Sequence, residues 1–176
     1  MLMKIKPEVF ILDVDGVLTD GKFYYSSSGK ILKCFGPDDN DALKILSNYI
    51  KIEFVTGDRK GFKITKKRIE DMKFKVSLVS TIKRFDWIKK RFNPNKVIYM
   101  GDGIFDYLTM SKVQYSIAPA NADNFCKKHA DYITKRSGGD RAVSEACIFI
   151  LSKFFKSKPL TKKIQPGKNF SGGWNS

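Results

Sequence analysis

Short hydrophobic runs along the chain alternate with longer segments in which apolar residues recur at helical spacing. The runs are compact, rich in β-branched side chains and bounded by polar or turn residues, which is typical of buried strands. The predicted strands are Val9–Leu12, Ile52–Val55, Val76–Val79, Val97–Met100, Tyr115–Ile117 and a shorter Tyr132–Ile133. The predicted helices are Asp41–Asn48, Phe62–Met72, Phe85–Phe92, Tyr107–Lys112, Asn121–Lys128 and Ala142–Phe155.

This alternation predicts an α/β fold, a Rossmann-like doubly wound parallel sheet with helices on both faces. Ligands bind such sheets at the carboxyl ends of the strands. One segment breaks the alternation: Phe23–Tyr25 and Ile31–Phe35 flank the turn sequence Ser26–Gly29. It predicts a small β-hairpin, at about 21–36, inserted after the first strand and beside the strand ends.

The chain length of 176 residues fits one compact domain, which we place at residues 1–155. Residues 156–176 mix Lys, Pro, Gly and Ser without periodicity, so they are predicted to form a flexible tail. The apolar stretch Val9–Leu12 is too short for a signal peptide or a membrane span. We therefore expect no membrane association and a cytoplasmic location.

The composition is strongly basic, with 33 Lys and Arg against 18 Asp and Glu and a net charge of +15. Such a surface attracts phosphorylated metabolites, nucleic acids and acidic lipids alike. The lysines are dispersed and form no long run interleaved with aromatic residues, so nucleic acid is the less favoured partner. Three cysteines without a C-x-x-C pair, and His129 as the only histidine, disfavour zinc and a disulfide framework.

The first candidate site lies where the strand Val9–Leu12 runs into Asp13-Val14-Asp15-Gly16. Two carboxylates one residue apart are thereby placed on a turning loop at the strand exit, and Gly16 permits the sharp turn. Asp13 is a candidate nucleophile, and Asp15 a candidate general acid and base. The alternative is an ordinary turn with local side-chain hydrogen bonds.

A second acidic cluster follows the strand Val97–Met100, at Asp102 and Asp106. Neighbouring strands that end in carboxylates would converge on one cation. Hard oxygen ligands favour magnesium, so Asp13, Asp15, Asp102 and Asp106 are the candidate metal residues and Mg²⁺ the expected cofactor.

Other residues fit a phosphate site. Thr56 and Gly57 follow the strand Ile52–Val55 and offer a hydroxyl and an open backbone N–H, although Thr56 could instead cap a helix. Lys83 is the candidate catalytic and substrate-binding cation, with a solvated helix lysine as the alternative. Arg59 could meet a substrate carboxylate or remain solvated.

Asp38, Asp39 and Asp41 are expected to cap the start of the first helix.

The order Asp13-Val-Asp-Gly-Val, Val55-Thr-Gly, a helix-borne lysine and Gly101-Asp-Gly-Ile-Phe-Asp106 resembles the four motifs of the haloacid dehalogenase-like hydrolase superfamily. The hairpin in place of a large cap domain, and Gly138-Gly139 followed by Ala142-Val143 and Glu145, narrow the resemblance. These features are similar to the 3-deoxy-D-manno-octulosonate 8-phosphate phosphatase family, and a related phosphatase of acylneuraminate 9-phosphates shares them.

The resemblance implies that Asp13 forms an aspartyl-phosphate and that Asp15 is the general acid and base. Magnesium would be held by Asp13, Asp102 and the backbone carbonyl of Asp15, with Asp106 orienting the site. It also implies that Thr56 and Gly57 meet phosphate oxygens, that Lys83 steadies nucleophile and phosphate, and that the protein is a homotetramer.

The expected function is therefore hydrolysis of a small phosphorylated sugar acid of lipopolysaccharide biosynthesis, either 3-deoxy-D-manno-octulosonate 8-phosphate or an acylneuraminate 9-phosphate. The alternatives are a basic nucleic-acid-binding or regulatory module without turnover, and a phosphatase of nucleic-acid ends. Asp58 stands where an arginine is often found in the family, and residues 36–43 differ from its usual short link. Both departures bear on the choice of substrate.

Overall fold

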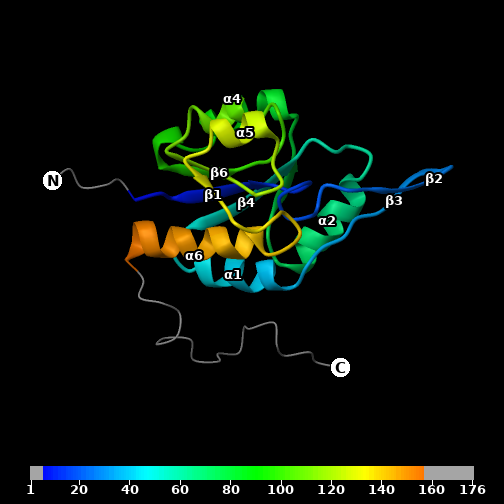
Figure 1. The fold of residues 1–176 in the computed structure, drawn as a ribbon, viewed down its shortest axis with the longest axis horizontal. Coiled ribbons are helices and arrows are strands. Elements are labelled where there is room, and N and C mark those ends of the chain that lie inside the picture. Colours follow the sequence, from blue (N-terminus) through cyan, green and yellow to red (C-terminus); the bar gives the residue numbers. More distant parts are fainter. Residues whose placement is uncertain (1–5, 157–176) are drawn as a thin grey trace.

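Six parallel strands form one sheet in the computed structural model, which describes residues 6–156 (Figure 1). The strands are β1 (Val9–Asp13), β4 (Lys51–Thr56), β5 (Val76–Leu78), β6 (Val97–Met100), β7 (Tyr115–Ala118) and β8 (Tyr132–Ile133). Their spatial order is β5-β4-β1-β6-β7-β8. Every neighbouring pair is parallel, so the predicted doubly wound sheet is confirmed.

Helices cover both faces of this sheet. They are α1 (Asp38–Leu46), α2 (Phe62–Asp71), α3 (Arg84–Lys89), α4 (Tyr107–Met110), α5 (Asn124–Lys128) and α6 (Ala142–Phe155), with 3₁₀ turns at Thr81–Lys83 and Pro94–Lys96. In Figure 1, α4 and α5 lie on one side of the sheet, and α1 and α6 on the other. No helix within residues 6–156 has the length and apolar character that crossing a bilayer requires.

The two helical layers explain why β1 is a continuous hydrophobic run. Phe10 and Leu12 point into the core beneath α1 and α6, whereas Val9 and Ile11 belong to a second cluster with Ile88 of α3. All five residues of β1 are buried. A strand covered on both faces loses the alternation of polar and apolar residues that a half-exposed strand shows.

The predicted hairpin is present between β1 and α1. It consists of the antiparallel strands β2 (Tyr24–Ser26) and β3 (Gly29–Leu32), and Gly29 adopts φ +115° at the turn. It projects from the end of the sheet where the parallel strands finish (Figure 1). The segment from β1 to α1 contains this hairpin and no larger cap domain.

The start of α1 differs from expectation. The helix begins at Asp38, not Asp41, and its N-cap, Pro37, provides no side-chain hydrogen bond. Asp39 instead accepts a hydrogen bond from the backbone N–H of Ser144 at 2.8 Å, in the first turn of α6. The buried carboxyl therefore satisfies a free N–H of another helix and links α1 to α6.

Gly138 brings the loop before α6 against the loop after β1. A Cβ at Gly138 would lie 1.9 Å from the carbonyl oxygen of Gly16, so only glycine permits this approach. The Gly138 N–H also donates to the side chain of Asn121 at 2.7 Å. The predicted tail lies, from residue 157 on, outside the described residues, and the division into domain and tail stays a prediction.

Candidate active site

The two acidic clusters meet at the point where the strand order reverses. β1 pairs with β4 on one side and with β6 on the other. Asp13 is the last residue of β1, and Asp102 follows β6 by two residues. The connections after β1 and β6 run to opposite faces of the sheet, and this switch point is where α/β sheets have their ligand-binding crevice.

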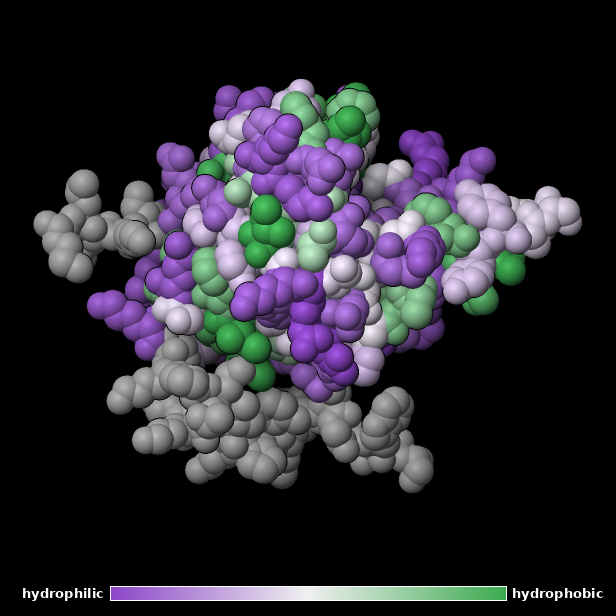
Figure 2. All heavy atoms as spheres, viewed as in Figure 1, coloured by the Kyte–Doolittle hydropathy of each residue, from purple (hydrophilic) through white to green (hydrophobic). Residues whose placement is uncertain are grey.

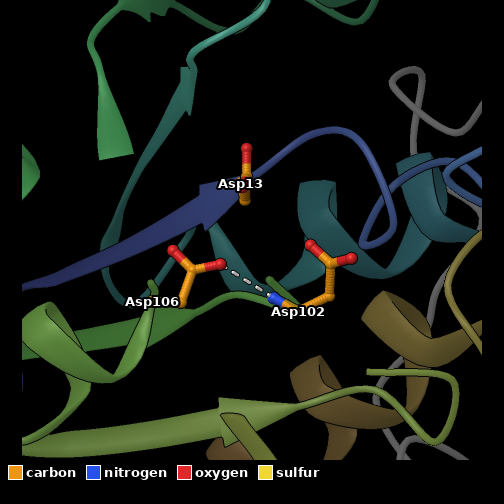
Figure 3. A group of neighbouring side chains, drawn as sticks. All are labelled: Asp13, Asp102 and Asp106. Carbon is orange, nitrogen blue, oxygen red and sulfur yellow. Dashed lines mark hydrogen bonds between the residues drawn. The ribbon is translucent and has the colours of Figure 1, made fainter. Parts of the chain in front are cut away.

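Three carboxylates converge in this crevice (Figure 3). Asp13, Asp102 and Asp106 each offer an oxygen within 4.8 Å of the others. Burial raises the pKa of Asp13 to about 6, with Arg84 opposing the rise and Asp106 adding to it. Burial, and then the negative charges of Asp13 and Asp106, raise the pKa of Asp102 to about 8. Such repulsion between buried carboxylates favours a cation among them.

Asp106 uses its oxygens for hydrogen bonds within the protein. Oδ1 accepts from the Tyr99 hydroxyl and from Arg84 at 2.8 Å, and Oδ2 accepts from the backbone N–H groups of Asp102 and Gly103. Its carboxylate therefore shapes the loop that carries Asp102. This arrangement favours the orienting role for Asp106 over direct metal ligation.

Asp102, by contrast, presents its carboxylate to the crevice. Within residues 6–156, no other residue donates a hydrogen bond to it, and it faces the backbone of Gly16. A Cβ at Gly16, where φ is +81°, would lie 1.9 Å from Asp102 Oδ2. Because Gly16 has no Cβ, the carboxylate of Asp102 can occupy the space beside its backbone.

Arg84, not Lys83, provides the cation at the centre of the site. Its Nη1 lies 2.7 Å from Asp13 Oδ2 and 2.8 Å from Asp106 Oδ1, and its side chain is 1% exposed. Lys83 is exposed at the end of the preceding 3₁₀ turn. Lys83 therefore lies away from the three carboxylates, whereas its neighbour Arg84 lies against them.

A signal for Arg84 was present in the sequence. Arg84 lies four residues before Ile88, so both side chains share one face of α3. Ile88 is fully buried in the core cluster beside β1. The same spacing relates Lys83 to the apolar Trp87, so this signal alone did not separate the two basic residues.

Asp15 lies beside the carboxylate cluster but its side chain takes no part in it. Oδ1 is 2.6 Å from the Lys33 ammonium, and Oδ2 accepts from the Thr56 hydroxyl at 3.4 Å. Thr56 is fully buried at the end of β4 and does not cap α2, whose N-cap is Gly61. The structure therefore brings Asp13, Asp15 and Thr56 together from two adjacent strand ends.

The loop after β4 separates the remaining candidates. Gly57 is exposed at the mouth of the site, next to Thr56. Arg59 is also exposed, and within residues 6–156 it forms no ion pair. Asp58 turns inward to Lys30 and Lys33, two hairpin residues that the sequence reading did not select.

The donor set fits a hard divalent cation. The crevice contains three carboxylates and one guanidinium, and the raised pKa values show that the metal-free cluster resists full ionisation. A divalent cation would offset this excess negative charge and would be held by carboxylate oxygens of Asp13 and Asp102. Cysteine and histidine are absent from the cluster, which disfavours the soft metals.

Comparison with known proteins establishes the family. Residues 22–146 match the haloacid dehalogenase-like hydrolase family model, and the chain belongs to this family. A 3-deoxy-D-manno-octulosonate 8-phosphate phosphatase from Salmonella typhi is 35% identical over 153 residues, covering 81% of this chain and 78% of the relative. These matches confirm the predicted resemblance and the prediction of a phosphatase.

Solved structures agree with this assignment. The 3-deoxy-D-manno-octulosonate 8-phosphate phosphatase from Yersinia pestis has a TM-score of 0.74 at 29% identity and covers 83% of this chain and 81% of its own. The Moraxella catarrhalis enzyme, solved with a magnesium ion, a phosphate ion and a KDO molecule, has a TM-score of 0.73 at 26% identity, with 83% and 86% coverage. These two likenesses support the α/β fold described above.

We expect divalent cation binding to strengthen as the pH rises from 6 to above 8. Protons held by Asp13 and Asp102, whose pKa values are about 6 and about 8, must leave before these carboxylates bind a cation. Isothermal titration with Mg²⁺ in two buffers of different ionisation enthalpy measures affinity and proton release together. The metal-free protein should also lose stability over this range, because it binds more protons folded than unfolded. A pH-independent affinity without proton release would contradict this assignment.

We expect Arg84→Met to lower the free energy of unfolding of the metal-free protein by about 3 kcal/mol, since it leaves two buried carboxylates without their cation. The matched control is Lys83→Met, which removes the neighbouring exposed charge and should change stability by no more than about 0.5 kcal/mol. Urea denaturation at pH 7.5 with a chelator measures both. Equal effects would remove Arg84 from the centre of the site.

Proposed function

We propose that this hydrolase is a magnesium-dependent phosphomonoesterase that works through an aspartyl-phosphate on Asp13. The observation that supports this best is the placement of Asp13: buried at the end of β1, anchored by Arg84, and flanked by Asp102 on one side and Asp15 on the other. A nucleophile needs its charge balanced and its orientation fixed, and these neighbours supply both.

In the proposed mechanism the reaction has two steps: the aspartyl-phosphate forms in the first and is hydrolysed in the second. In the first, a carboxylate oxygen of Asp13 bonds to phosphorus as the bond from phosphorus to the leaving oxygen breaks, and Asp15 gives that oxygen a proton. In the second, water adds to phosphorus and gives a proton to Asp15, and the bond to Asp13 breaks to release inorganic phosphate. Bound Mg²⁺ supplies positive charge for the phosphoryl oxygens.

The phosphate itself would be received by the strand-end loops. Thr56 lies next to Asp15, and the exposed Gly57 beside it has space for a phosphate oxygen at its N–H. Arg84 takes the role first assigned to Lys83, because its guanidinium reaches Asp13. We assign Arg59 no more than a contact with the leaving group, since its side chain lies at the surface.

For the substrate we propose a phosphorylated sugar acid, with 3-deoxy-D-manno-octulosonate 8-phosphate ahead of an acylneuraminate 9-phosphate. The names of the relatives support the former, and the small hairpin leaves the site open to a metabolite. We place the reaction in the cytoplasm, in lipopolysaccharide biosynthesis. The nucleic-acid-binding module without turnover stays the alternative, supported only by the net charge of +15.

We further propose that the protein is a homotetramer assembled through its hairpins. Phe23, Tyr24, Tyr25, Ile31 and Leu32 are between 39% and 61% exposed. The hairpin projects at the right of Figure 2 with pale and green side chains. Apolar residues gathered on a projecting edge are typical of an interface between subunits.

A panel of phosphate esters tests the proposed activity. We expect Mg²⁺-dependent phosphate release from 3-deoxy-D-manno-octulosonate 8-phosphate to exceed release from acylneuraminate 9-phosphate, hexose phosphates, nucleotides and oligonucleotide ends. Asp13→Asn should abolish turnover, whereas Asp20→Asn should retain it, because the Asp20 side chain is exposed and, among residues 6–156, accepts a hydrogen bond only from the N–H of Lys22. Salt-sensitive DNA binding without any phosphate release would favour the module instead.

Light scattering during size-exclusion chromatography tests the assembly. We expect the wild-type protein to elute as a tetramer and Leu32→Glu to shift it to smaller species, because the charge falls on the exposed hairpin. Ile148→Glu is the matched control, since Ile148 is similarly exposed but lies on α6. A monomeric wild type, or dissociation by both variants alike, would contradict assembly through the hairpin.

A further inference from the structure

Lys33 carries a buried ammonium group from the hairpin to the active site. It follows β3 directly, and its side chain has no exposed surface. Three oxygens surround its Nζ: Asp15 Oδ1 at 2.6 Å, Thr65 Oγ1 at 2.8 Å and Asp58 Oδ2 at 2.9 Å. These oxygens come from the loops after β1 and β4 and from α2.

This environment leaves Lys33 little capacity to bind substrate. An ammonium group has three N–H donors, and here three protein oxygens lie within hydrogen-bonding distance of it. A buried charge is tolerated only where it is paired and hydrogen-bonded, which this arrangement provides. The contacts of Lys33 therefore point to a role within the protein.

Asp58 anchors Lys33 in this position. Burial alone would raise the pKa of Asp58, but hydrogen bonds from Lys30 and Lys33 outweigh it and lower the pKa to about 2. Its Oδ1 accepts the backbone N–H of Gly61 at 3.0 Å, which ties it to the start of α2. Lys30 Nζ also lies 3.2 Å from the centre of the Phe23 ring, just before β2, so the lysine that pairs with Asp58 contacts the other side of the hairpin as well.

Asp15 is held from two directions as a result. The Lys33 ammonium forms an ion pair with Oδ1 at 2.6 Å, and the buried hydroxyl of Thr56 donates a hydrogen bond to Oδ2. Asp15 sits in the turn after β1, where its backbone alone leaves the χ angles of the side chain free to rotate. The ammonium of Lys33 removes most of that freedom.

We propose that Lys33 is a positioning residue that holds Asp15 in the orientation required for proton transfer to the leaving oxygen. The inference rests on the proposed function, in which Asp15 is the general acid. It makes the hairpin part of the chemistry, because a residue that directly follows β3 fixes the acid that completes bond cleavage.

The proposal predicts a dependence on the leaving group. Phenolate is a much stronger base than p-nitrophenolate and needs a proton as it departs, whereas p-nitrophenolate departs without one. The two esters differ little in size, so their binding should be similar. A misplaced Asp15 should therefore slow cleavage of phenyl phosphate far more than cleavage of p-nitrophenyl phosphate.

The experiment measures release of the phenol in the first turnover, which isolates ester cleavage from hydrolysis of the aspartyl-phosphate. For Lys33→Met we expect a loss of about 100-fold on phenyl phosphate and less than about 5-fold on p-nitrophenyl phosphate. The matched variant is Lys30→Met, which also removes one hairpin charge from Asp58 but leaves Asp15 paired. It should change the two rates by the same factor.

Equal losses on the two esters in Lys33→Met would overturn the proposal, because they would show a structural role alone. If that variant does not fold, Lys33→Gln keeps a donor of similar length without the charge, and the same comparison of rates decides. Failure of the proposed function is distinguishable: the wild type would then cleave neither ester, or Asp15→Asn would show no preference for the better leaving group.

Discussion

The ion pair between Arg84 and two buried carboxylates is the constraint on which the rest of the site depends. The Arg84 guanidinium joins the end of β1 to the loop after β6, because it contacts both Asp13 and Asp106. Burying three charges is costly, and removal of one partner costs more than the intact group. The same contact fixes the nucleophile of the proposed reaction and, through Asp106, the loop that carries Asp102. Stability and site geometry are thus set by the same side chain.

Lys33 forms a second charged centre on the other side of Asp15. It connects the hairpin to the loops after β1 and β4, whereas Arg84 connects the core of the sheet to α3. Asp13 and Asp15 are two residues apart, yet each faces a different buried cation. This separation explains how adjacent carboxylates can serve different roles: the environment of each, and not its position in the motif, determines what it does.

The sequence predicted most of the fold because its signals are local. Buried runs such as Val9–Leu12 mark strands, and Asp13 and Asp102 follow from the rule that ligands lie at strand ends. What it missed depends on contacts distant in sequence. Lys33 meets Asp15 and Asp58 only after the hairpin folds back, and Asp39 caps a helix that begins more than a hundred residues later. That Arg84 and not Lys83 contacts Asp13 likewise depends on where the 3₁₀ turn Thr81–Lys83 ends and α3 begins.

The acidic residues at the strand ends are balanced by nearby positive charges, although the protein as a whole is strongly basic. With a divalent cation bound, the positive charges of the cation and Arg84 would equal the negative charges of Asp13, Asp102 and Asp106. When Asp15 is ionised, Lys30 and Lys33 likewise balance Asp15 and Asp58. Each group is then neutral, so neither repels a phosphate ester and neither attracts it over a distance. The long-range attraction must come from the surface, where a net charge of +15 raises the local concentration of anions of any kind. Selection among those anions is therefore left to short-range contacts around the strand ends.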